Sequence, residues 1–307
     1  MEHYTDKKKK NQDLIKYISK HLSEQNLDTI WSCGTYLEFY ADNTLEVKRL
    51  NKANFCKNRF CPMCAWRKAR KDALTVSIIM QYLKEEHNLD FIFLTLTAPN
   101  VKASELKTEI TKYNKSFKKL AERKEFKKIS KGYMRKLEVT YNSERDDFHP
   151  HFHVMIAVNK SYFKSRDYLS KKKWLTLWQD VMNDKSITQV DIQKVEADDQ
   201  KAIAEIAKYS AKDSDYMVSE EVFDAFYKAL KGRQLVTYSG VFKEALTDFK
   251  RGALNKYKEM DLTQYIYRLV FTWNRAYADY IQYELNELSE EEKNKINKKL
   301  IDEIEVE

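Results

Sequence analysis

The stretch that decides the fold is His149-Pro-His-Phe-His153, which holds three of the six histidines of the chain. Successive side chains of a β-strand point to opposite faces. A strand predicted over 149–158 therefore places His149, His151 and His153 on one face and apolar residues on the other. Three imidazoles on one face are typical of metal ligands, whereas a single histidine is more often a core residue.

A second predicted strand, 133–141, precedes the histidine strand and pairs with it as a hairpin. With the turn centred near residues 145–146, Glu138 stands opposite His153 and shares the histidine face. Two imidazoles and a carboxylate with open coordination positions can hold Mg²⁺ or Mn²⁺, with Zn²⁺ also possible. A register slip of one residue would remove Glu138, and His149 is then the alternative third ligand.

The remaining elements alternate between strand and helix patterns. Phe91–Thr97 is a short, buried strand that ends before Pro99. Because the clearest strand pair is a hairpin, we expect an α+β fold with a central antiparallel sheet flanked by helices. Helices are predicted over 12–24, 64–86, 104–129, 174–182, 200–216 and 219–230, further strands over 187–195 and 234–238, a hairpin over 31–49, and a mostly helical region after 240.

Four cysteines form the pattern C-x22-C-x4-C-x2-C. Cytosolic proteins rarely keep structural disulfides, so the pattern indicates a metal or a redox function. A redox Cys-x-x-Cys belongs in a thioredoxin-like βαβ unit, and none surrounds this one. The sequence therefore favours a small four-cysteine segment that binds structural Zn²⁺, with the ligands Cys33, Cys56, Cys61 and Cys64.

Positive charge is concentrated beside the cysteines. Residues 49–71 contain eight basic residues and no acidic one, within a chain of net charge +8. Such a segment is typical of a DNA phosphate-binding surface, and a solvated cationic face is the alternative. The acidic residues gather instead in 284–307, as a tail that limits nonspecific binding. The candidate DNA-binding residues are Arg59, Arg67, Lys68, Arg70 and Lys71.

Composition excludes several classes of protein. Only 5 Gly and 3 Pro exclude collagen-like and Gly-linker architectures. No apolar run reaches the length of a membrane span, and the polar, Lys-rich start is not a secretory signal. We therefore expect a cytoplasmic protein without membrane contact.

The segment 205–216 is predicted to be helical, with a polar stripe on one side. Glu205, Tyr209, Lys212 and Tyr216 fall on this stripe, and apolar residues take the opposite side. An ordinary surface face is the simpler interpretation. A tyrosinate that attacks a phosphodiester, however, needs a nearby cation to polarise the phosphate, and a carboxylate can later activate water.

Together these motifs resemble the HUH endonucleases, most closely the replication initiator (Rep) proteins of small Gram-positive rolling-circle plasmids. The resemblance covers about residues 30–240. It rests on four motifs in the family's order: Phe55–Arg67 with its cysteines, Phe93-Leu-Thr-Leu-Thr97, the histidine strand, and Glu205-Ile-Ala-Lys-Tyr-Ser-Ala-Lys212.

The resemblance implies a mechanism. The histidine strand lies in the middle of an antiparallel sheet, and a divalent ion on His151, His153 and Glu138 polarises the scissile phosphate. Tyr209 nicks the plasmid origin, which leaves a 5′-phosphotyrosine and a free 3′-OH primer. Glu205 then activates water for termination, and Tyr216 is the two-tyrosine alternative. Lys212 of the third motif completes the catalytic set.

The chain has no Gly-x-x-x-x-Gly-Lys-[Ser/Thr] motif, the nucleotide-binding loop of helicases. We therefore expect a host helicase and a host DNA polymerase to act together with this protein. Its expected DNA partners are double-strand origin DNA and single-stranded DNA, and the protein itself is expected to be a monomer or a dimer. A relaxase or transposase of the same fold, or a zinc-stabilised DNA-binding regulator that does not nick, is the alternative. The predicted parts are an N-terminal helical arm (1–30), the zinc-binding basic segment (31–72), the nicking domain (73–240) and a helical C-terminal region with the acidic tail (241–307).

Overall fold

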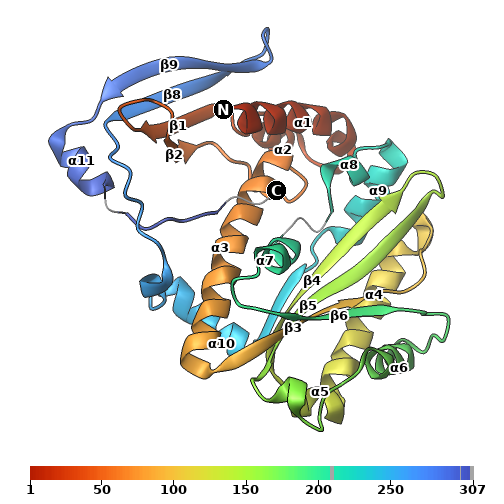
Figure 1. The fold of residues 1–307 in the computed structure, drawn as a ribbon. Coiled ribbons are helices and arrows are strands. Elements are labelled where there is room, and N and C mark those ends of the chain that lie inside the picture. The colour runs from red at the N-terminus through yellow and green to blue at the C-terminus, as the bar shows by residue number, and fades with distance from the viewer. Residues whose placement is uncertain (208–210, 298, 305–307) are drawn as a thin grey trace. The chain divides into compact units, whose positions relative to one another are not determined.

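The computed structural model describes residues 1–207, 211–297 and 299–304 (Figure 1). These residues form two compact units, each described here by itself. The first unit combines Met1–Lys71 with Lys258–Ile304, and the second is Asp72–Tyr257. Among the described residues, none of the helices has both the length and the apolar character needed to cross a membrane.

The second unit contains a five-stranded antiparallel sheet with the strand order β6-β3-β5-β4-β7. The strand that carries the three histidines, β5, is the middle one, which confirms the position expected from the resemblance. The α+β class with an antiparallel sheet is confirmed as well. The strands are β3 (Leu89–Leu96), β4 (Ser130–Asn142), β5 (Asp147–Asn159), β6 (Val190–Val195) and β7 (Val236–Gly240).

The face of this sheet opposite the histidines is covered by the helix α4 (Ala103–Glu122), against which α6 and α9 pack (Figure 1). Phe152 alternates with the histidines on β5, and its ring lies 5.4 Å from that of Tyr113 and 5.6 Å from that of Phe117, both edge-on. An aromatic core therefore lies on this side of the sheet. The histidine face is also covered in part, because Phe91 on the same face is buried and packs against Phe242. The other helices of the unit are α5 (Lys124–Ile129), η2 (Tyr162–Lys164), α6 (Lys171–Met182), α7 (Gln200–Ala207), α8 (Asp213–Tyr216), α9 (Glu220–Leu230), α10 (Val241–Lys250) and η3 (Asn255–Tyr257), and α3 (Pro62–His87) contributes to both units.

Two predicted helices are each divided in the structure. The helix expected over 104–129 is broken at Arg123, whose backbone is extended between α4 and α5. The helix expected over 200–216 is broken before α8, because Lys212 is also extended (φ −78°, ψ 148°). Asp213 then accepts a hydrogen bond from the Ser214 backbone N–H. Such short polar side chains compete with helical hydrogen bonds and favour helix starts, which explains the break.

The first unit is built around a four-stranded sheet with the order β2-β1-β8-β9. The hairpin of β1 (Tyr36–Ala41) and β2 (Lys48–Ala53) confirms the one predicted around 31–49. The helices that accompany the sheet are α1 (Glu2–Ile18), η1 (Ser19–His21), α2 (Glu24–Trp31) and α11 (Glu290–Ile296).

The C-terminal region is helical at α10 and α11, but the expectation of helix between them is wrong. Residues 267–287 form a β-hairpin of β8 (Tyr267–Asn274) and β9 (Asp279–Glu287), and β8 pairs with β1. Leu269, Phe271 and Trp273 alternate along β8 and all point into the core of the first unit. This period of two is a strand pattern, whereas the sequence analysis expected a mostly helical region here.

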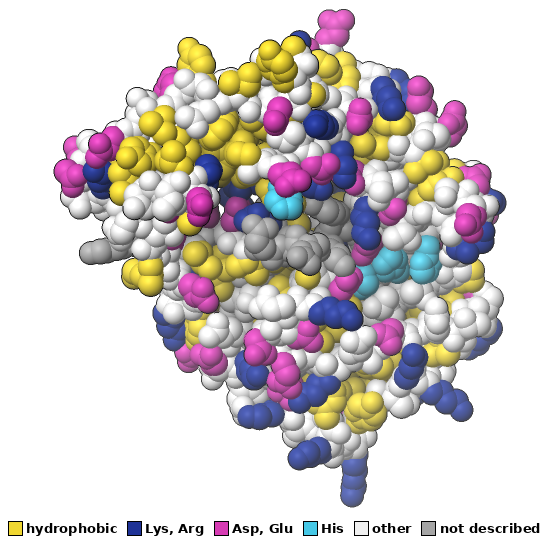
Figure 2. All heavy atoms as spheres, turned by 45° about the horizontal axis from the view of Figure 1, so that its top comes forward, with side chains coloured by type: hydrophobic (Ala, Val, Ile, Leu, Met, Phe, Trp, Pro, Cys, Tyr) yellow, Lys and Arg dark blue, Asp and Glu magenta, His cyan; other side chains and the backbone are white. Residues whose placement is uncertain are grey.

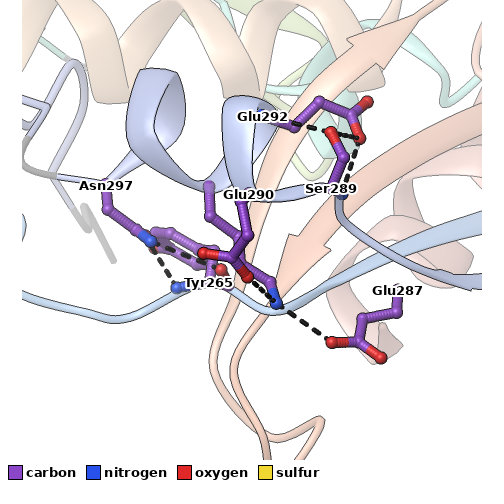
Figure 3. A network of polar contacts seen from close by, with 7 residues as sticks. Tyr265, Glu287, Ser289, Glu290, Glu292 and Asn297 are labelled. Carbon is purple, nitrogen blue, oxygen red and sulfur yellow. Dashed lines mark hydrogen bonds and ion pairs between the residues drawn. The ribbon is translucent and has the colours of Figure 1, made fainter.

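The acidic segment after β9 is folded (Figure 3). The Ser289 hydroxyl accepts from the Glu292 backbone N–H, and Glu292 accepts from the Ser289 backbone N–H, which forms a capping box at the start of α11. The Asn297 side chain accepts from the Tyr265 backbone N–H at 2.8 Å. Residues predicted to be an acidic tail are therefore held by specific hydrogen bonds.

The close approach of β4 and β7 generates a test of the fold. Gly240 pairs with Gly132 and has φ +52°, and a Cβ added to it would lie 2.9 Å from the Gly132 Cα. We expect Gly240→Ala to lower the free energy of unfolding by about 2–4 kcal/mol, from both the clash and the strained φ. Urea titration measures this loss. Gly232→Ala is the control, because Gly232 has φ +72° but open space around its Cβ position, and an equal loss in both variants would contradict the steric argument.

Candidate active site

The histidine face of the second unit is set by the pairing of β4 with β5. Glu138 stands opposite His151, Lys136 opposite His153, and Thr140 opposite His149. The predicted register, with Glu138 opposite His153, is wrong by two residues on one strand. Because the side-chain period is also two, Glu138 stays on the histidine face. The turn explains the difference: Asn142 pairs with Asp147, and Asp146 adopts φ +48° between them.

Glu138, His151 and His153 converge on one point. The Glu138 Oε2 lies 2.9 Å from Nε2 of His153 and 3.4 Å from Nε2 of His151. Glu138 and His153 are only 5% and 7% exposed, and the three ligand atoms lie within 4.8 Å of one another, so the group can hold a metal ion. His149 is not part of this group, and its ring lies 5.2 Å from that of His151.

The outer nitrogens of the two histidines are also held. The His151 Nδ1–H donates to the His149 backbone carbonyl at 3.2 Å, because a carbonyl oxygen can only accept. His153 Nδ1 lies 3.3 Å from the Thr95 hydroxyl, which comes from the predicted motif Phe93–Thr97. Such contacts fix the ring orientation of metal-binding histidines. The Nε2 atoms of both rings are thereby turned toward the Glu138 carboxylate, an arrangement that suits a shared cation.

The electrostatics of the group favour cation binding. Burial alone would raise the pKa of Glu138, but hydrogen bonds from His151 and His153 and the charge of Lys136 hold the pKa below its usual range. Burial lowers the pKa of His153, although the Glu138 hydrogen bond opposes this shift. The lowered pKa of Glu138 favours the ionised carboxylate and the lowered pKa of His153 favours its neutral imidazole, which are the forms that bind metals.

Lys136 is a site residue that the sequence interpretation missed. Its side chain is 1% exposed, and its Nζ lies 3.4 Å from the backbone carbonyl of Glu205 near the end of α7. A cation is stabilised at the C-terminal end of a helix dipole. Lys136 thus connects α7 to the strand that carries Glu138. The signal in the sequence was its position two residues before Glu138, on the same face of the strand.

The predicted tyrosine stripe is only partly described. Tyr209 lies outside the described residues. Glu205 is half-buried on α7, Lys212 is exposed, and Tyr216 is 2% exposed. The Tyr216 ring packs against those of Phe223 and Phe226, at 6.0 and 6.1 Å. Because the helix is broken, Tyr216 faces the core and does not continue the stripe of Glu205.

The four cysteines come together in the first unit. The Sγ of Cys33 lies 3.5 Å from that of Cys64 and 3.6 Å from that of Cys61, and Cys56 lies 3.6 Å from Cys64. All four are free thiols, and their sulfur atoms lie within 4.8 Å of one another. This arrangement confirms the predicted cluster, and it can hold one metal ion.

Hydrogen-bond donors surround these sulfur atoms. The backbone N–H groups of Lys57 and Asn58 donate to Cys64 and Cys56, and the Asn11 amide donates to Cys61. The ammonium of Lys8 is buried and donates to Asn11 and to two backbone carbonyls. Burial lowers the pKa of Lys8 to about 8, and the cysteines oppose that shift. Such donors stabilise thiolates, which are the ligand form of cysteine.

The basic residues beside the cysteines have two different environments. Arg67 is buried and donates to the Glu303 carboxylate at 2.6 Å, and the Arg70 Nε lies 3.4 Å from the same carboxylate. The charges of these two arginines are therefore engaged within the chain by the C-terminal segment. The remaining candidates are exposed at the surface, namely Arg59, Lys68 and Lys71. Figure 2 shows lysine and arginine side chains distributed over the face in view, where histidine side chains also reach the surface.

Comparison with known proteins identifies the class. A family model described as replication protein matches residues 47–281, more than half of the chain. The chain therefore belongs to the replication protein family (Rep_1), which confirms the resemblance to plasmid replication initiators that the motifs indicated.

Individual relatives agree with this assignment. The chain is 56% identical over 221 residues to a protein named Protein rep from Staphylococcus aureus, an alignment that covers 72% of this chain and 96% of that protein. It is 33% identical over 299 residues to a Protein rep from Bacillus amyloliquefaciens, covering 87% and 88% of the two chains. A Protein rep from Streptococcus pneumoniae is 36% identical over 230 residues, covering 72% and 71%. No solved structure matches the chain.

The carboxylate–histidine group generates a binding test. Glu138→Gln keeps the shape of the side chain but removes its charge, so we expect the affinity for Mn²⁺ to fall at least about tenfold. Isothermal titration calorimetry measures this affinity. Thr140→Val is the control, because Thr140 lies on the same face of β4 but outside the group. Unchanged Mn²⁺ binding by Glu138→Gln would show that the ion binds elsewhere.

Proposed function

We propose that the protein is a plasmid rolling-circle replication initiator with an HUH-type nicking site in its second unit, which corresponds to the predicted domain 73–240. It cuts one strand of the double-strand origin and primes leading-strand synthesis. The observation that carries this proposal is the convergence of Glu138, His151 and His153 on the central strand of an antiparallel sheet. Membership of the replication protein family supports it independently.

The proposed reaction is a transesterification. The phenolate oxygen of Tyr209 attacks the scissile phosphorus, and the bond from phosphorus to the 3′ oxygen breaks. The departing oxygen takes up a proton and becomes the free 3′-OH primer, while the 5′ phosphate stays on the tyrosine. A divalent ion, Mg²⁺ or Mn²⁺, held by Glu138, His151 and His153 would polarise the phosphate. Lys136 supports this arrangement because it joins Glu205 of α7, four residues before Tyr209, to the metal-binding face.

Termination is assigned to Glu205. Its carboxylate takes a proton from the water that hydrolyses a phosphotyrosine bond, and this step releases the enzyme. The burial of Tyr216 among Phe223 and Phe226 favours Glu205 over a second tyrosine nucleophile. Lys212 is exposed close to the same segment, where its ammonium is suited to a phosphate.

We assign Zn²⁺ to the cysteine cluster in a structural role. A tetrahedral zinc with metal–sulfur bonds of about 2.3 Å separates its ligands by roughly 3.8 Å. The sulfur atoms of Cys33, Cys56, Cys61 and Cys64 lie 3.5 to 3.6 Å apart in three of their pairs. The exposed Arg59, Lys68 and Lys71 beside this cluster are the proposed contacts to origin phosphates. A host helicase and a host DNA polymerase are the expected partners.

Nicking is tested on supercoiled plasmid that carries the origin, with Mg²⁺ or Mn²⁺. We expect the wild-type protein to produce nicked circles with protein on the 5′ end. In Tyr209→Phe, which lacks the nucleophilic hydroxyl, we expect nicking to fall at least about 10³-fold while origin binding persists. Tyr216→Phe is the matched control and should nick normally, since Tyr216 is buried. Origin binding without any nicking by the wild-type protein would indicate a DNA-binding regulator instead.

The role of Glu205 is tested separately in a replication assay. Glu205→Gln should nick at the wild-type rate, because the tyrosine is intact. It should terminate poorly, because an amide cannot accept a proton from water. Gel analysis should then show products longer than one plasmid unit. If this variant still produces closed circles of one plasmid unit, termination depends on a second tyrosine and not on Glu205.

Zinc binding is tested by metal analysis of the purified protein. We expect about one zinc per chain, lost in Cys64→Ser together with thermal stability of the first unit. Glu138→Gln is the control and should retain this zinc, because the two clusters share no residue. A folded wild-type protein without zinc contradicts the four-cysteine assignment.

A further inference from the structure

A polar cavity of about 430 Å³ lies at one end of the five-stranded sheet. Its walls are formed by residues at the ends of β3 and β4, by residues at the start of β5, and by residues 186–189, which precede β6 in the sequence. Its size is within the range of small-ligand sites. The side chains with hydrogen-bonding groups include those of Asn100, Thr140, Asn142, His149, Thr188 and Gln189.

The cavity continues the histidine face. Thr140 and His149 are register partners and therefore point to the same side of the sheet as Glu138 and His151. Thr97, which follows the last residue of β3, also lines the cavity. His149 lines the cavity, and its ring is 5.2 Å from that of His151. A ligand held by the metal-binding group thus has the cavity beside it.

The chemistry of the lining suits a nucleobase. Amide and hydroxyl side chains offer both donors and acceptors, which are the groups that read base edges, and the ring of His149 can stack on a base. No Asp or Glu is present among the described residues that line the cavity. Arg145 adds a cation for a phosphate, and its guanidinium is held by Asp147 at 3.0 Å.

The walls of the cavity are already braced. Asn100 donates to Asp147 at 2.7 Å, and the Arg145 backbone N–H donates to the Asn142 side chain at 2.9 Å. The Thr97 hydroxyl donates to the Gln189 backbone carbonyl at 3.1 Å, which ties the segment before β6 to the end of β3. The site is therefore organised before a ligand arrives, a property that lowers the entropic cost of binding.

We propose that this cavity binds one nucleobase of the single-stranded origin, from a nucleotide next to the scissile phosphate, and so contributes to the choice of the nick site. This inference rests on the proposed function, because the metal-binding group locates the scissile phosphate. The discriminating contacts come from Thr140, Thr188 and Gln189. The His149 imidazole, the substitute metal ligand of the sequence interpretation, becomes part of the base subsite.

The test combines protein variants with oligonucleotides that lack one base. Single-stranded oligonucleotides across the nick site carry one abasic position each, and fluorescence anisotropy measures their affinity for the Tyr209→Phe protein, which does not cut them. We expect one position beside the nick at which loss of the base weakens binding about tenfold. The measurement is repeated with a Tyr209→Phe protein that also carries Thr140→Val and Gln189→Ala. In this protein, removal of the base at the same position should change the affinity less than about twofold, because the base has already lost its partners.

A matched control uses a different cavity. Thr237→Val lies in a second cavity of about 360 Å³ of the same unit, lined also by Phe117 and Arg135, and should keep the full abasic effect. The proposal is overturned if the Thr140/Gln189 variant weakens all oligonucleotides equally, or if no abasic position depends on it. Nicking of the unmodified oligonucleotide by the protein with Tyr209 intact separates the two ideas. If the protein nicks but no abasic position changes its affinity, only the base subsite is contradicted. If the protein does not nick, the proposed function is contradicted, and with it the location of the subsite.

Discussion

The pairing of β4 with β5 is the constraint on which the site depends. It sets Glu138 opposite His151 and diagonal to His153, so three ligand atoms from two strands meet within 4.8 Å. A shift by a single residue would turn Glu138 to the opposite face, among the aromatic rings of the core. The same pairing sets Thr140 opposite His149 at the cavity. One register thus determines the metal-binding group, its buried lysine and the proposed base subsite together.

Burial gives this group its chemical character. A carboxylate and a lysine ammonium that are almost fully buried are costly unless they are paired. Here Glu138 is compensated by His151 and His153, and the Lys136 ammonium reaches the C-terminal end of α7. A divalent ion would complete this balance of charge. The C-terminal end of α7 is thereby held close to the metal-binding face by an interaction that is independent of the metal.

The first unit is organised by its cysteines and by contacts between distant parts of the chain. Cys33 precedes β1, and Cys56, Cys61 and Cys64 follow β2, so the cluster closes around this hairpin. The C-terminal residues return to the same region, where Glu303 binds Arg67 and Arg70. The acidic C-terminal segment and the basic segment 49–71, which are far apart in the sequence, therefore neutralise each other's charge in part. The exposed cations of this segment carry the proposed DNA contacts.

The sequence by itself determined the features that depend on local periodicity and spacing. The alternation of His149, His151 and His153, the cysteine spacing and the motif order predicted the central strand, the two clusters and the family. The tertiary structure alone decided the register of Glu138, the break at Lys212 that buries Tyr216, and the hairpin at 267–287. It also decided the pairing of Arg67 with Glu303. These features arise from turn geometry, from competition between short polar side chains and the helix, and from partners more than 200 residues apart, as in the pairing of β8 with β1.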